Sequence, residues 1–402
     1  MFENIIGQEQ AISRLRKEVA GALLPATLLF CGPDYSGKSS TALELARALT
    51  CEGADAGVPW NCRCRSCEMQ RHLLHPDTLM LGGRYFNREI AIAADALKRD
   101  RREPLRFLFE RSVRKLARRF DPVLWEGEEK RLAKVEQLLA DLDEKLDPYL
   151  PGGQLPSDEA VHAGIDAVVE TCEKIAGLVS LDSVPINTVR RLSLWARLAP
   201  AGNAKIALIE NVDRLQESAR NALLKTLEEP PVGVYFVLTT QRRGAVIATI
   251  LSRARSYDFL SRGPDESSEV ITRIFRDSPG ETPSIRDYFS SKDGQGLGAL
   301  AERFVESVVA QATIELGLLD EINQTVQNLG GAEGFRYFIE EVSILLQRLV
   351  RTGSGAGARE IPLRSLAQWH ALLQNAVTRH ESYNTSVTMT LEGLFYGMRK
   401  AS

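Results

Sequence analysis

Apolar positions near the start of the chain change from helical spacing to a strand-like run and back again. Residues 9–20 carry apolar side chains three and four positions apart, whereas 26–31 is a short and almost wholly apolar run. A glycine-bearing loop follows, and helical spacing returns over 38–49. A strand, a loop and a helix in this order predict the opening of an α/β fold with a parallel sheet.

The alternation of strand and helix patterns resumes further along the chain. A short apolar stretch occupies 78–81, and we expect strands at 205–210 and 234–239 and helices at 186–198 and 217–228. From Pro264 onward strand patterning disappears, and the expected helices include 334–352, 363–379 and 387–399. The pattern therefore predicts an α/β domain followed by an all-helical part.

A highly charged segment, 85–177, interrupts the α/β pattern. Apolar residues at helical spacing within 98–120 and a leucine-rich seam within 132–146 predict a helical hairpin. One interpretation is that the charges of this insertion face water. The other is that its basic residues contact DNA or an acidic partner. Those residues are Arg101, Arg102, Arg106, Arg111, Arg114, Lys115, Arg118 and Arg119.

Composition narrows the class of protein. The 402-residue chain has a formal net charge of −3 and 26% charged residues. These values are typical of a soluble globular protein and exclude a generally basic nucleic-acid coat protein. The sequence has no apolar run of about 18 residues, and its first residues lack the pattern of a signal peptide. We therefore expect a cytoplasmic protein without a membrane-spanning segment.

The loop after the first predicted strand, GPDYSGKS at 32–39, fits the phosphate-loop pattern G-x-x-x-x-G-K-[ST]. Gly32 and Gly37 let backbone N–H groups face a β-phosphate at the positive end of the following helix. Lys38 supplies a cation for the phosphates, and the hydroxyl of Ser39 is a ligand for Mg²⁺. Together with Ser40, these residues predict a site for ATP with Mg²⁺.

In ATPases of this kind a second strand ends in an acidic residue that holds Mg²⁺ through water, and a neighbouring carboxylate activates the attacking water. The candidate here is the strand at 205–210, in which Glu210 is followed by Asn211. Glu210 can serve the metal, but Asn211 has no carboxylate to accept a proton. The alternative is that 205–210 is an ordinary core strand.

Four of the six cysteines fall within a short stretch, namely Cys51, Cys62, Cys64 and Cys67. In a reducing compartment such a cluster is more often a metal site than a set of disulfides. Free thiols and disulfides are the alternatives.

Several short motifs occur in a characteristic order. They are IIGQ at 5–8, FCGP at 30–33, HPD at 75–77, LLKTLEEPP at 223–231 and ILSR at 250–253. This ordered set resembles the bacterial clamp-loader subunits of DNA polymerase III, the gamma/tau and delta-prime chains of the AAA+ superfamily. The resemblance covers roughly 1–77 and 186–259, and it implies an AAA+ α/β phosphate-loop domain.

The resemblance implies roles for individual residues. Ser252-Arg253-Ala254 resembles a Ser-Arg-Cys motif whose arginine reaches the ATP of the adjacent subunit, so Arg253 would be an arginine finger acting in trans. Otherwise Arg253 is an ordinary surface arginine. Thr240 resembles a polar sensor position, unless it is a plain strand end. Leu297, within DGQGLGAL at 293–300, stands where active subunits carry a second sensor arginine.

The cysteines resemble the four-cysteine zinc module of the same family, which is a closed structural site rather than a catalytic one. The first Cys-x-x-Cys step of the family is shortened here to Cys62-x-Cys64, and Asn61 stands where a ligand is expected. Cys62 would then have to shift its backbone register to coordinate zinc.

Taken together, Asn211, Leu297 and Arg253 favour a delta-prime-like subunit with little or no ATPase activity of its own and no polymerase site. The expected architecture is an AAA+ core with a helical insertion, a small helical lid and an all-α oligomerisation domain. The expected bounds are 1–84 and 178–262 for the core, 51–67 for the zinc knuckle, 85–177 for the insertion, 263–325 for the lid and 326–402 for the C-terminal domain.

Such a subunit would work in a ring with gamma/tau and delta subunits and help to load the beta sliding clamp onto primed DNA. Two alternatives remain. One is a catalytically active gamma/tau-type ATPase of the same ring, against which the absence of a glutamate at Asn211 counts. The other is a stand-alone phosphate-loop enzyme, which would have no use for Arg253.

Overall fold

The structure is a computed structural model that describes residues 1–53, 57–84, 86–178, 184–280, 284–292, 296–313, 315–329, 331–352, 363–383 and 385–401. The chain divides into two compact units, Met1–Tyr288 and Phe289–Ser402. The first contains the sheet and the second is helical.

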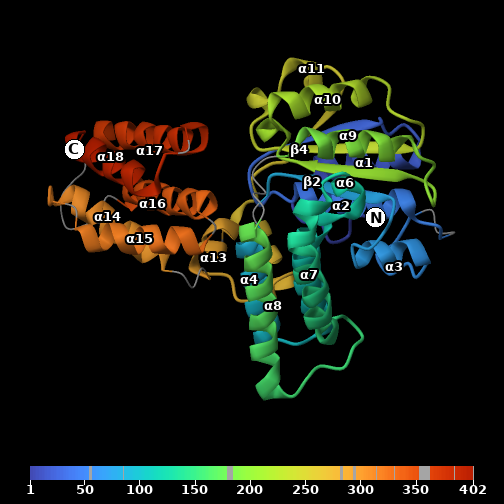
Figure 1. Ribbon diagram of the computed structural model, residues 1–402, viewed down its shortest axis with the longest axis horizontal. Helices are drawn as coiled ribbons and strands as arrows, with labels where there is room; N and C mark the ends of the chain where they lie inside the picture. Colours follow the sequence, from blue (N-terminus) through green and yellow to red (C-terminus); the bar gives the residue numbers. More distant parts are fainter. Residues whose placement is uncertain are drawn as a thin grey trace. The chain divides into compact units, whose positions relative to one another are not determined.

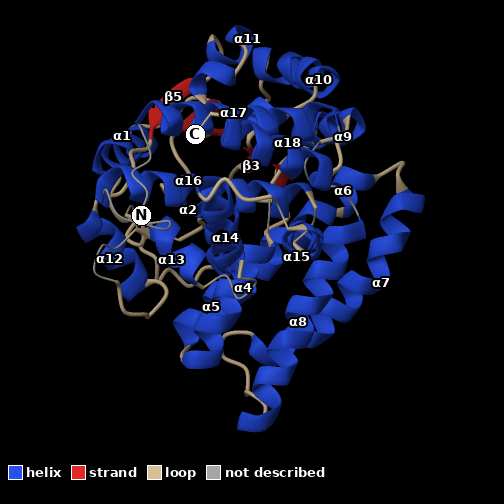
Figure 2. Ribbon diagram, turned by 90° about the vertical axis from the view of Figure 1, so that its left-hand side faces the viewer, coloured by secondary structure: helices blue, strands red, loops and turns tan. Residues whose placement is uncertain are grey.

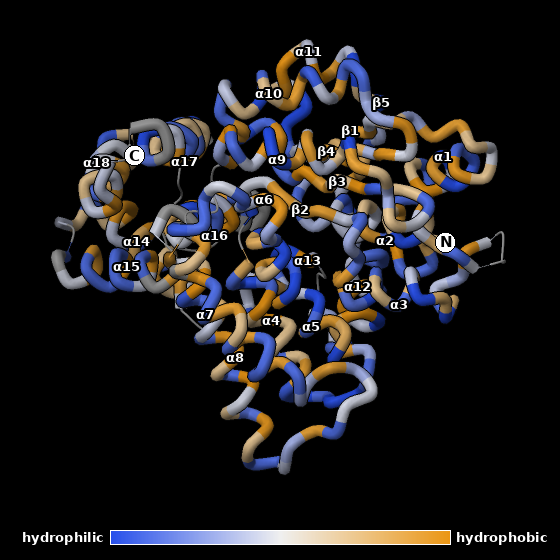
Figure 3. The backbone as a smooth tube through the Cα atoms, turned by 45° about the vertical axis from the view of Figure 1, so that its right-hand side comes forward, coloured by the Kyte–Doolittle hydropathy of each residue, from blue (hydrophilic) through white to orange (hydrophobic). Residues whose placement is uncertain are grey.

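A five-stranded parallel sheet forms the centre of the first unit, in the order β2-β3-β4-β1-β5. The strands are β1 Thr27–Cys31, β2 Thr78–Gly82, β3 Lys205–Glu210, β4 Val234–Thr240 and β5 Arg255–Asp258. Strands β1, β2 and β3 are buried along their whole length, as in a parallel sheet covered on both faces. The backbone in Figure 3 is correspondingly hydrophobic along β1, β3 and β4. The expected α/β fold with a parallel sheet is confirmed.

Alternate residues of the strands serve two separate hydrophobic cores. On one face, Phe30 and Leu208 pack with helices α1, Glu9–Ala20, and α2, Lys38–Thr50. On the other face, Leu29 and Ile209 pack with helices α9, Ile186–Arg197, and α10, Glu217–Glu228. The sheet is therefore enclosed by helices on both sides, and its strand ends carry the site described below.

The insertion between β2 and α9 contains more helices than the predicted hairpin. They are α4 Asn87–Arg99, α5 Glu103–Ala117, α6 Pro122–Trp125, α7 Glu129–Leu146 and α8 Asp158–Leu178, with short 3-10 turns η1 Arg118–Phe120 and η2 Asp147–Tyr149. Helix α8 packs along both α7 and α4 (Figure 1). Their apolar residues belong to the same core as the α9 face of the sheet. The insertion is thus an extension of the sheet domain's core.

The basic residues of the insertion are engaged within the chain. Arg106 donates to the backbone oxygens of Tyr149 and Gly153 at 3.1 and 2.8 Å, and Arg114 forms an ion pair with Glu110 at 2.8 Å. The others also have partners: Arg101 pairs with Asp158, Arg102 with Asp100, Arg111 with the backbone oxygens of Gln70 and Arg71, Lys115 with Glu89, Arg118 with Asp121 and Arg119 with Glu210. Several of these charges hold the insertion against the sheet domain instead of facing water.

The remaining helices of the first unit are short, apart from α12. They are α3 Arg65–Arg71, α11 Ala248–Leu251, α12 Pro264–Arg273 and α13 Ile285–Ser291, the last of which runs into the second unit, with the 3-10 turns η3 Val212–Arg214 and η4 Arg243–Ala245.

The second unit consists of helices in the described residues, and Figure 2 shows how strongly helices outweigh strands in the chain. They are α14 Leu297–Val309, α15 Leu316–Asn328, α16 Ala332–Thr352, α17 Leu363–Tyr383 and α18 Val387–Lys400. Trp369 is fully buried in its core and donates its indole N–H to the Met398 oxygen at 2.7 Å. The expected lid, 263–325, has α12 in the first unit and α14 and α15 in the second, so its boundaries stay a prediction. None of the helices in the described residues is long and apolar enough to cross a membrane.

Candidate nucleotide site and cysteine cluster

The predicted nucleotide-site residues meet at the carboxyl edge of the sheet. Strands β1, β3 and β4 are parallel neighbours, so the residues that end or follow them lie at one edge, where ligands of open α/β sheets bind. Gly32 follows β1, Glu210 ends β3 and Thr240 ends β4. The Gly32 N–H donates to the Thr240 backbone oxygen at 3.1 Å, which fixes the start of the phosphate loop against β4.

Both glycines of the phosphate loop are required by the backbone. A Cβ on Gly32 would lie 2.1 Å from the Phe259 backbone oxygen, so the residue after β1 has no room for a side chain. Gly37 has φ +96° and leads directly into α2. Arg262, which sequence reasoning missed, lies over this loop and donates to the backbone oxygens of Tyr35 and, at 3.0 Å, Ile6.

The Lys38 side chain is buried against its own loop. Its ammonium donates to the backbone oxygens of Gly32 at 2.7 Å and Pro33 at 2.6 Å. Burial lowers the pKa of Lys38, and the negative charges of Asp34 and Glu210 oppose that shift. Ser40 is exposed on α2, and its predicted role in nucleotide binding stays a prediction.

Glu210 is the most heavily engaged carboxylate of the site. The Ser39 hydroxyl donates to its Oε1, as does Nη1 of Arg84 at 2.5 Å, and Nη2 of Arg119 donates to Oε2. Burial alone would raise the pKa of Glu210, but the positive charges of Arg84 and Arg119 prevail and lower it to about 2. Ser39 and Glu210, the two predicted Mg²⁺ ligands, are therefore neighbours, and their role as metal ligands stays a prediction. Sequence reasoning did not find the two arginines.

The polar residues at the ends of β3 and β4 are held by backbone contacts. Asn211 has φ +50°, a left-handed conformation that asparagine tolerates. Its side-chain amide donates to the Gly83 oxygen at 2.6 Å, and its backbone N–H donates to the Thr239 hydroxyl at 3.2 Å. The buried Thr240 hydroxyl donates to Asp213 at 2.8 Å, so the proposed sensor is tied to the turn after β3.

Arg253 lies apart from the phosphate loop of its own chain, in the turn after α11. Its guanidinium donates to Glu228 at 2.6 Å and to the Thr249 backbone oxygen at 2.8 Å, and 31% of its side chain is exposed. Among the described residues, none of its hydrogen bonds reaches residues 32–39. Leu297 is fully buried in the core of the second unit, whereas residues 293–295 of the same motif lie outside the described residues.

The four clustered cysteines converge on one point. Their sulfur atoms all lie within 4.8 Å of one another, with 3.7 Å between Cys51 and Cys62 and 3.9 Å between Cys51 and Cys64. A tetrahedral Zn²⁺ with sulfur ligands at about 2.3 Å requires sulfur atoms about 3.8 Å apart. The donor set and spacing therefore fit structural zinc, and Cys62 reaches the cluster despite the shortened spacing.

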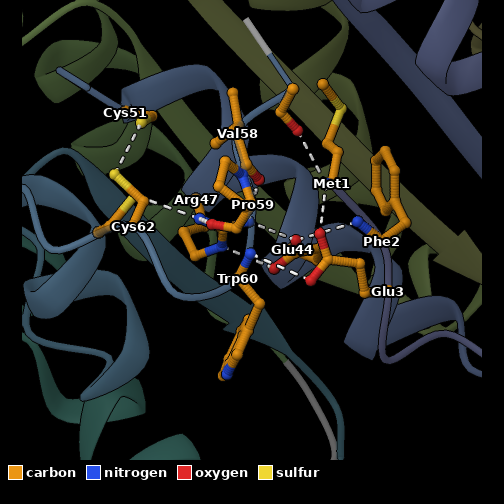
Figure 4. A network of polar contacts seen from close by, with 12 residues as sticks. Met1, Phe2, Glu3, Glu44, Arg47, Cys51, Val58, Pro59, Trp60 and Cys62 are labelled. Atoms are coloured by element: carbon orange, nitrogen blue, oxygen red, sulfur yellow. Dashed lines mark hydrogen bonds and ion pairs between the residues drawn. The ribbon is translucent and has the colours of Figure 1, made fainter. Parts of the chain in front are cut away.

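Backbone and side-chain donors surround the cysteine cluster. The Gly53 N–H donates to Cys51 at 3.3 Å, and Nη1 of Arg47 lies 3.2 Å from the Cys67 sulfur. Arg47 also pairs with the buried Glu44 at 2.7 Å, and Glu44 accepts from the Phe2 N–H at 3.1 Å (Figure 4). Because Arg47 and Glu44 lie on α2, the helix that follows the phosphate loop also anchors the cysteine cluster and the N-terminal residues.

Comparison with known proteins identifies relatives of this chain. A family model described as DNA polymerase III, delta subunit, matches residues 7–119 and 157–262. The delta' subunit of DNA polymerase III from Escherichia coli K12 is 30% identical over 156 residues, covering 36% of this chain and 41% of that protein. The replication factor C small subunit of Methanoregula boonei is 30% identical over 179 residues, covering 40% of this chain and 56% of that protein. The tau subunit of Bacillus subtilis is 31% identical over 110 residues, covering 24% of this chain and 20% of that protein.

Each of these matches spans less than two thirds of the relative's own length. The family match also reaches further than the motif resemblance, because it includes 85–119 and 157–177 and leaves only 120–156 of the insertion unmatched. More than half of the sequence agrees with the family model, and the sheet has the expected α/β form. The chain therefore belongs to the DNA polymerase III delta subunit family, a group of clamp-loader AAA+ proteins.

Proposed function

We propose that this chain is a delta-prime-like clamp-loader subunit that binds ATP and lends Arg253 to the ATP of the adjacent subunit. The observation that carries the proposal is the placement of Arg253. Its guanidinium is partly exposed, and its partners Glu228 and Thr249 are local and lie outside its own phosphate loop. An arginine finger acting in trans requires such a group, because it must reach a phosphate of another chain.

The residue after β3 supports a weak or absent ATPase activity of the chain itself. Asn211 carries an amide that cannot accept a proton from an attacking water, and its nitrogen donates to the Gly83 oxygen. Nucleotide binding then has a structural role in this subunit, and hydrolysis takes place at sites on its neighbours.

The expected partners follow from the relatives and from the helical second unit. The relatives are named as delta' and tau subunits of DNA polymerase III. By analogy, this chain would join gamma/tau and delta subunits in a ring, through a C-terminal oligomerisation domain at 326–402. The ring would open the beta sliding clamp and place it on primed DNA in the cytoplasm. The cysteine cluster would hold a structural Zn²⁺ beside α2.

The test of the arginine finger is the ATPase rate of the reconstituted ring with Arg253→Ala. A lower rate, with the ring still assembled, is the expected result. Arg243→Ala is a matched control. Arg243 is also exposed and pairs with Asp258 at 3.8 Å, but it has no proposed role at the nucleotide of a neighbour. An unchanged ATPase rate of the ring with Arg253→Ala would contradict the proposal.

The retained phosphate loop favours a second candidate, a gamma/tau-type subunit that hydrolyses ATP. The two candidates differ in the behaviour of the purified chain. Brisk ATP turnover by the isolated chain, with no gain from Asn211→Glu, would establish the ATPase candidate and contradict the non-hydrolysing one.

A further inference from the structure

Two arginines converge on the position that serves Mg²⁺ in phosphate-loop proteins. Arg84 follows β2, and Arg119 lies in the 3-10 turn η1 of the insertion. Arg84 donates to Oε1 of Glu210 and Arg119 to Oε2, so both carboxylate oxygens accept from a guanidinium. The charged insertion thereby reaches the nucleotide site itself.

The geometry leaves no room for a metal ion between the two predicted ligands. Nη1 of Arg84 lies 2.5 Å from Oε1 of Glu210 and 3.0 Å from the Ser39 hydroxyl, which itself donates to the same Oε1. Mg²⁺ requires six oxygen ligands in octahedral geometry at about 2.0–2.1 Å. An ion bound to Ser39 that meets Oε1 of Glu210, directly or through a bound water, would have to displace the Arg84 guanidinium from that oxygen. The residues present therefore do not fit Mg²⁺.

The arginines are fixed in place. Side-chain exposure is 3% for both Arg119 and Glu210, and 22% for Arg84. Both guanidinium groups lie over the ring of the buried Phe86, at 5.3 Å for Arg119 and 5.9 Å for Arg84. Arg84 is held further by Glu89, which also pairs with Lys115. Because these side chains are buried, ion-paired and stacked, the arrangement is a fixed part of the fold.

The charges also favour an anion over a dication at this position. Four positive groups, those of Arg84, Arg119, Lys115 and Lys38, surround three carboxylates, those of Glu210, Glu89 and Asp34. Nearby positive charge repels a second cation and attracts phosphate oxygens. Nε and Nη1 of Arg119 are buried and have no hydrogen-bond partner among the described residues.

We propose that Arg84 and Arg119 take the place of Mg²⁺, so that the site binds ATP as a metal-free polyanion. This inference rests on the proposed nucleotide binding and adds the form in which the nucleotide is held. Phosphoryl transfer in phosphate-loop ATPases relies on a metal that bridges the β- and γ-oxygens. A site that excludes this ion holds its nucleotide without turning it over.

Calorimetric titration of the full-length chain with ATP tests the proposal, once with Mg²⁺ and once with EDTA. The wild-type protein is expected to bind ATP with affinities that agree within about threefold in the two conditions. The double variant Arg84→Met/Arg119→Met opens the position beside Ser39 and Glu210. Its binding is expected to become dependent on Mg²⁺ by at least about tenfold.

The matched control is Arg102→Gln, because Arg102 is an exposed arginine of the same insertion and pairs only with Asp100 among the described residues. It should behave as the wild type in both conditions. A wild-type affinity that falls by about tenfold or more in EDTA overturns the inference and leaves nucleotide binding intact. A double variant that folds and binds ATP equally well with Mg²⁺ and with EDTA also overturns the inference.

The two titrations of the wild-type protein, with Mg²⁺ and with EDTA, test the inference even if the double variant fails to fold. Absence of ATP binding in both conditions overturns the proposed nucleotide binding, and this inference with it. The ring assay with Arg253→Ala is independent of that result, since it measures an arginine that acts on the nucleotide of a neighbour.

Discussion

The carboxylate of Glu228 and the guanidinium of Arg253 form an ion pair at 2.6 Å, although 25 positions separate them in the sequence. The two residues come from LLKTLEEPP and ILSR, the motifs that most strongly indicate the family. Both side chains are partly exposed, at 48% and 31%. An exposed ion pair of this kind contributes about 0.2–1 kcal/mol. If Arg253 acts in trans as proposed, Glu228 would orient it on the surface and would have to release it, which an exposed pair allows with a small loss of free energy.

Glu228→Gln is accordingly expected to change the ATPase rate of the reconstituted ring by less than about fivefold, the factor that corresponds to about 1 kcal/mol. Arg253→Ala is expected to reduce hydrolysis at the site it serves by about 10³-fold or more, since an arginine finger stabilises charge in the transition state. Single-turnover hydrolysis by the assembled ring measures both. A loss for Glu228→Gln as large as that for Arg253→Ala would contradict this division of roles.

Cys64→Ser tests the cysteine cluster. Because four thiolates complete the tetrahedron of a structural site, loss of one ligand is expected to reduce bound zinc from about one ion per chain to little or none. The melting temperature should fall as well, and incubation of the wild type with a strong chelator should have the same effect. Metal analysis and thermal unfolding measure these outcomes.

Cys172→Ser is the control for this experiment. Cys172 is buried in α8, away from the cluster, so its substitution should cost stability without changing the zinc content. Zinc retained by Cys64→Ser at the wild-type level would show that the sulfur atoms converge for another reason.

Much of the sheet and the outline of the candidate nucleotide site could be predicted from sequence, because their signals are local. Strands β1, β3 and β4 are apolar runs beside turn residues, and their predicted ends agree with the structure to within one residue, while β2 coincides with the apolar stretch noted at 78–81. Strand β5 was missed, since it is a four-residue edge strand, Arg255–Asp258, in which only Tyr257 is buried. An edge strand with exposed polar side chains has neither an apolar run nor an alternating pattern.

The arginines at Glu210 could not be predicted, because their contacts are not local. Arg84 and Arg119 lie 126 and 91 positions before Glu210. In the sequence, Arg119 is one of many basic residues in a charged segment that is equally compatible with a solvated helix. Only the folded insertion, whose apolar residues continue the core beside the sheet, brings this residue to the end of β3.

The two phosphate-loop glycines should differ in their response to substitution. In Gly32→Ala the new Cβ would meet the Phe259 backbone oxygen at 2.1 Å, a contact that only movement of the backbone can relieve. In Gly37→Ala the nearest atom is Nη2 of Arg262, the far end of a long side chain and not backbone, and the main cost is about 1–2 kcal/mol for a left-handed alanine. Urea unfolding should therefore show a larger loss for Gly32→Ala. Equal losses would mean that the strand end adjusts more easily than its packing suggests.

Glu89 gives the chain a specific sensitivity to acid. Burial would raise its pKa, but the charges of Arg84 and Lys115 lower it from an ordinary value of 4.5 to about 2 in the folded protein. Between these values the unfolded chain binds a proton that the folded chain does not, so stability falls as the pH falls through this window. Above pH 4.5 the contribution is fully present.

Glu89→Gln should therefore lower the free energy of unfolding at neutral pH by roughly 1.5–3 kcal/mol, because charge-assisted hydrogen bonds to Arg84 and Lys115 are lost. It should also flatten the decline of stability between pH 4.5 and about 2, since the titrating group is gone. Urea unfolding at a series of pH values measures both effects. Glu170→Gln is the control, because the one ion pair of Glu170 among the described residues is an exposed one with Lys174 on α8, so its loss should alter stability little. If the free energy of unfolding of Glu89→Gln declined between pH 4.5 and about 2 as steeply as that of the wild type, another carboxylate would be responsible for the acid sensitivity.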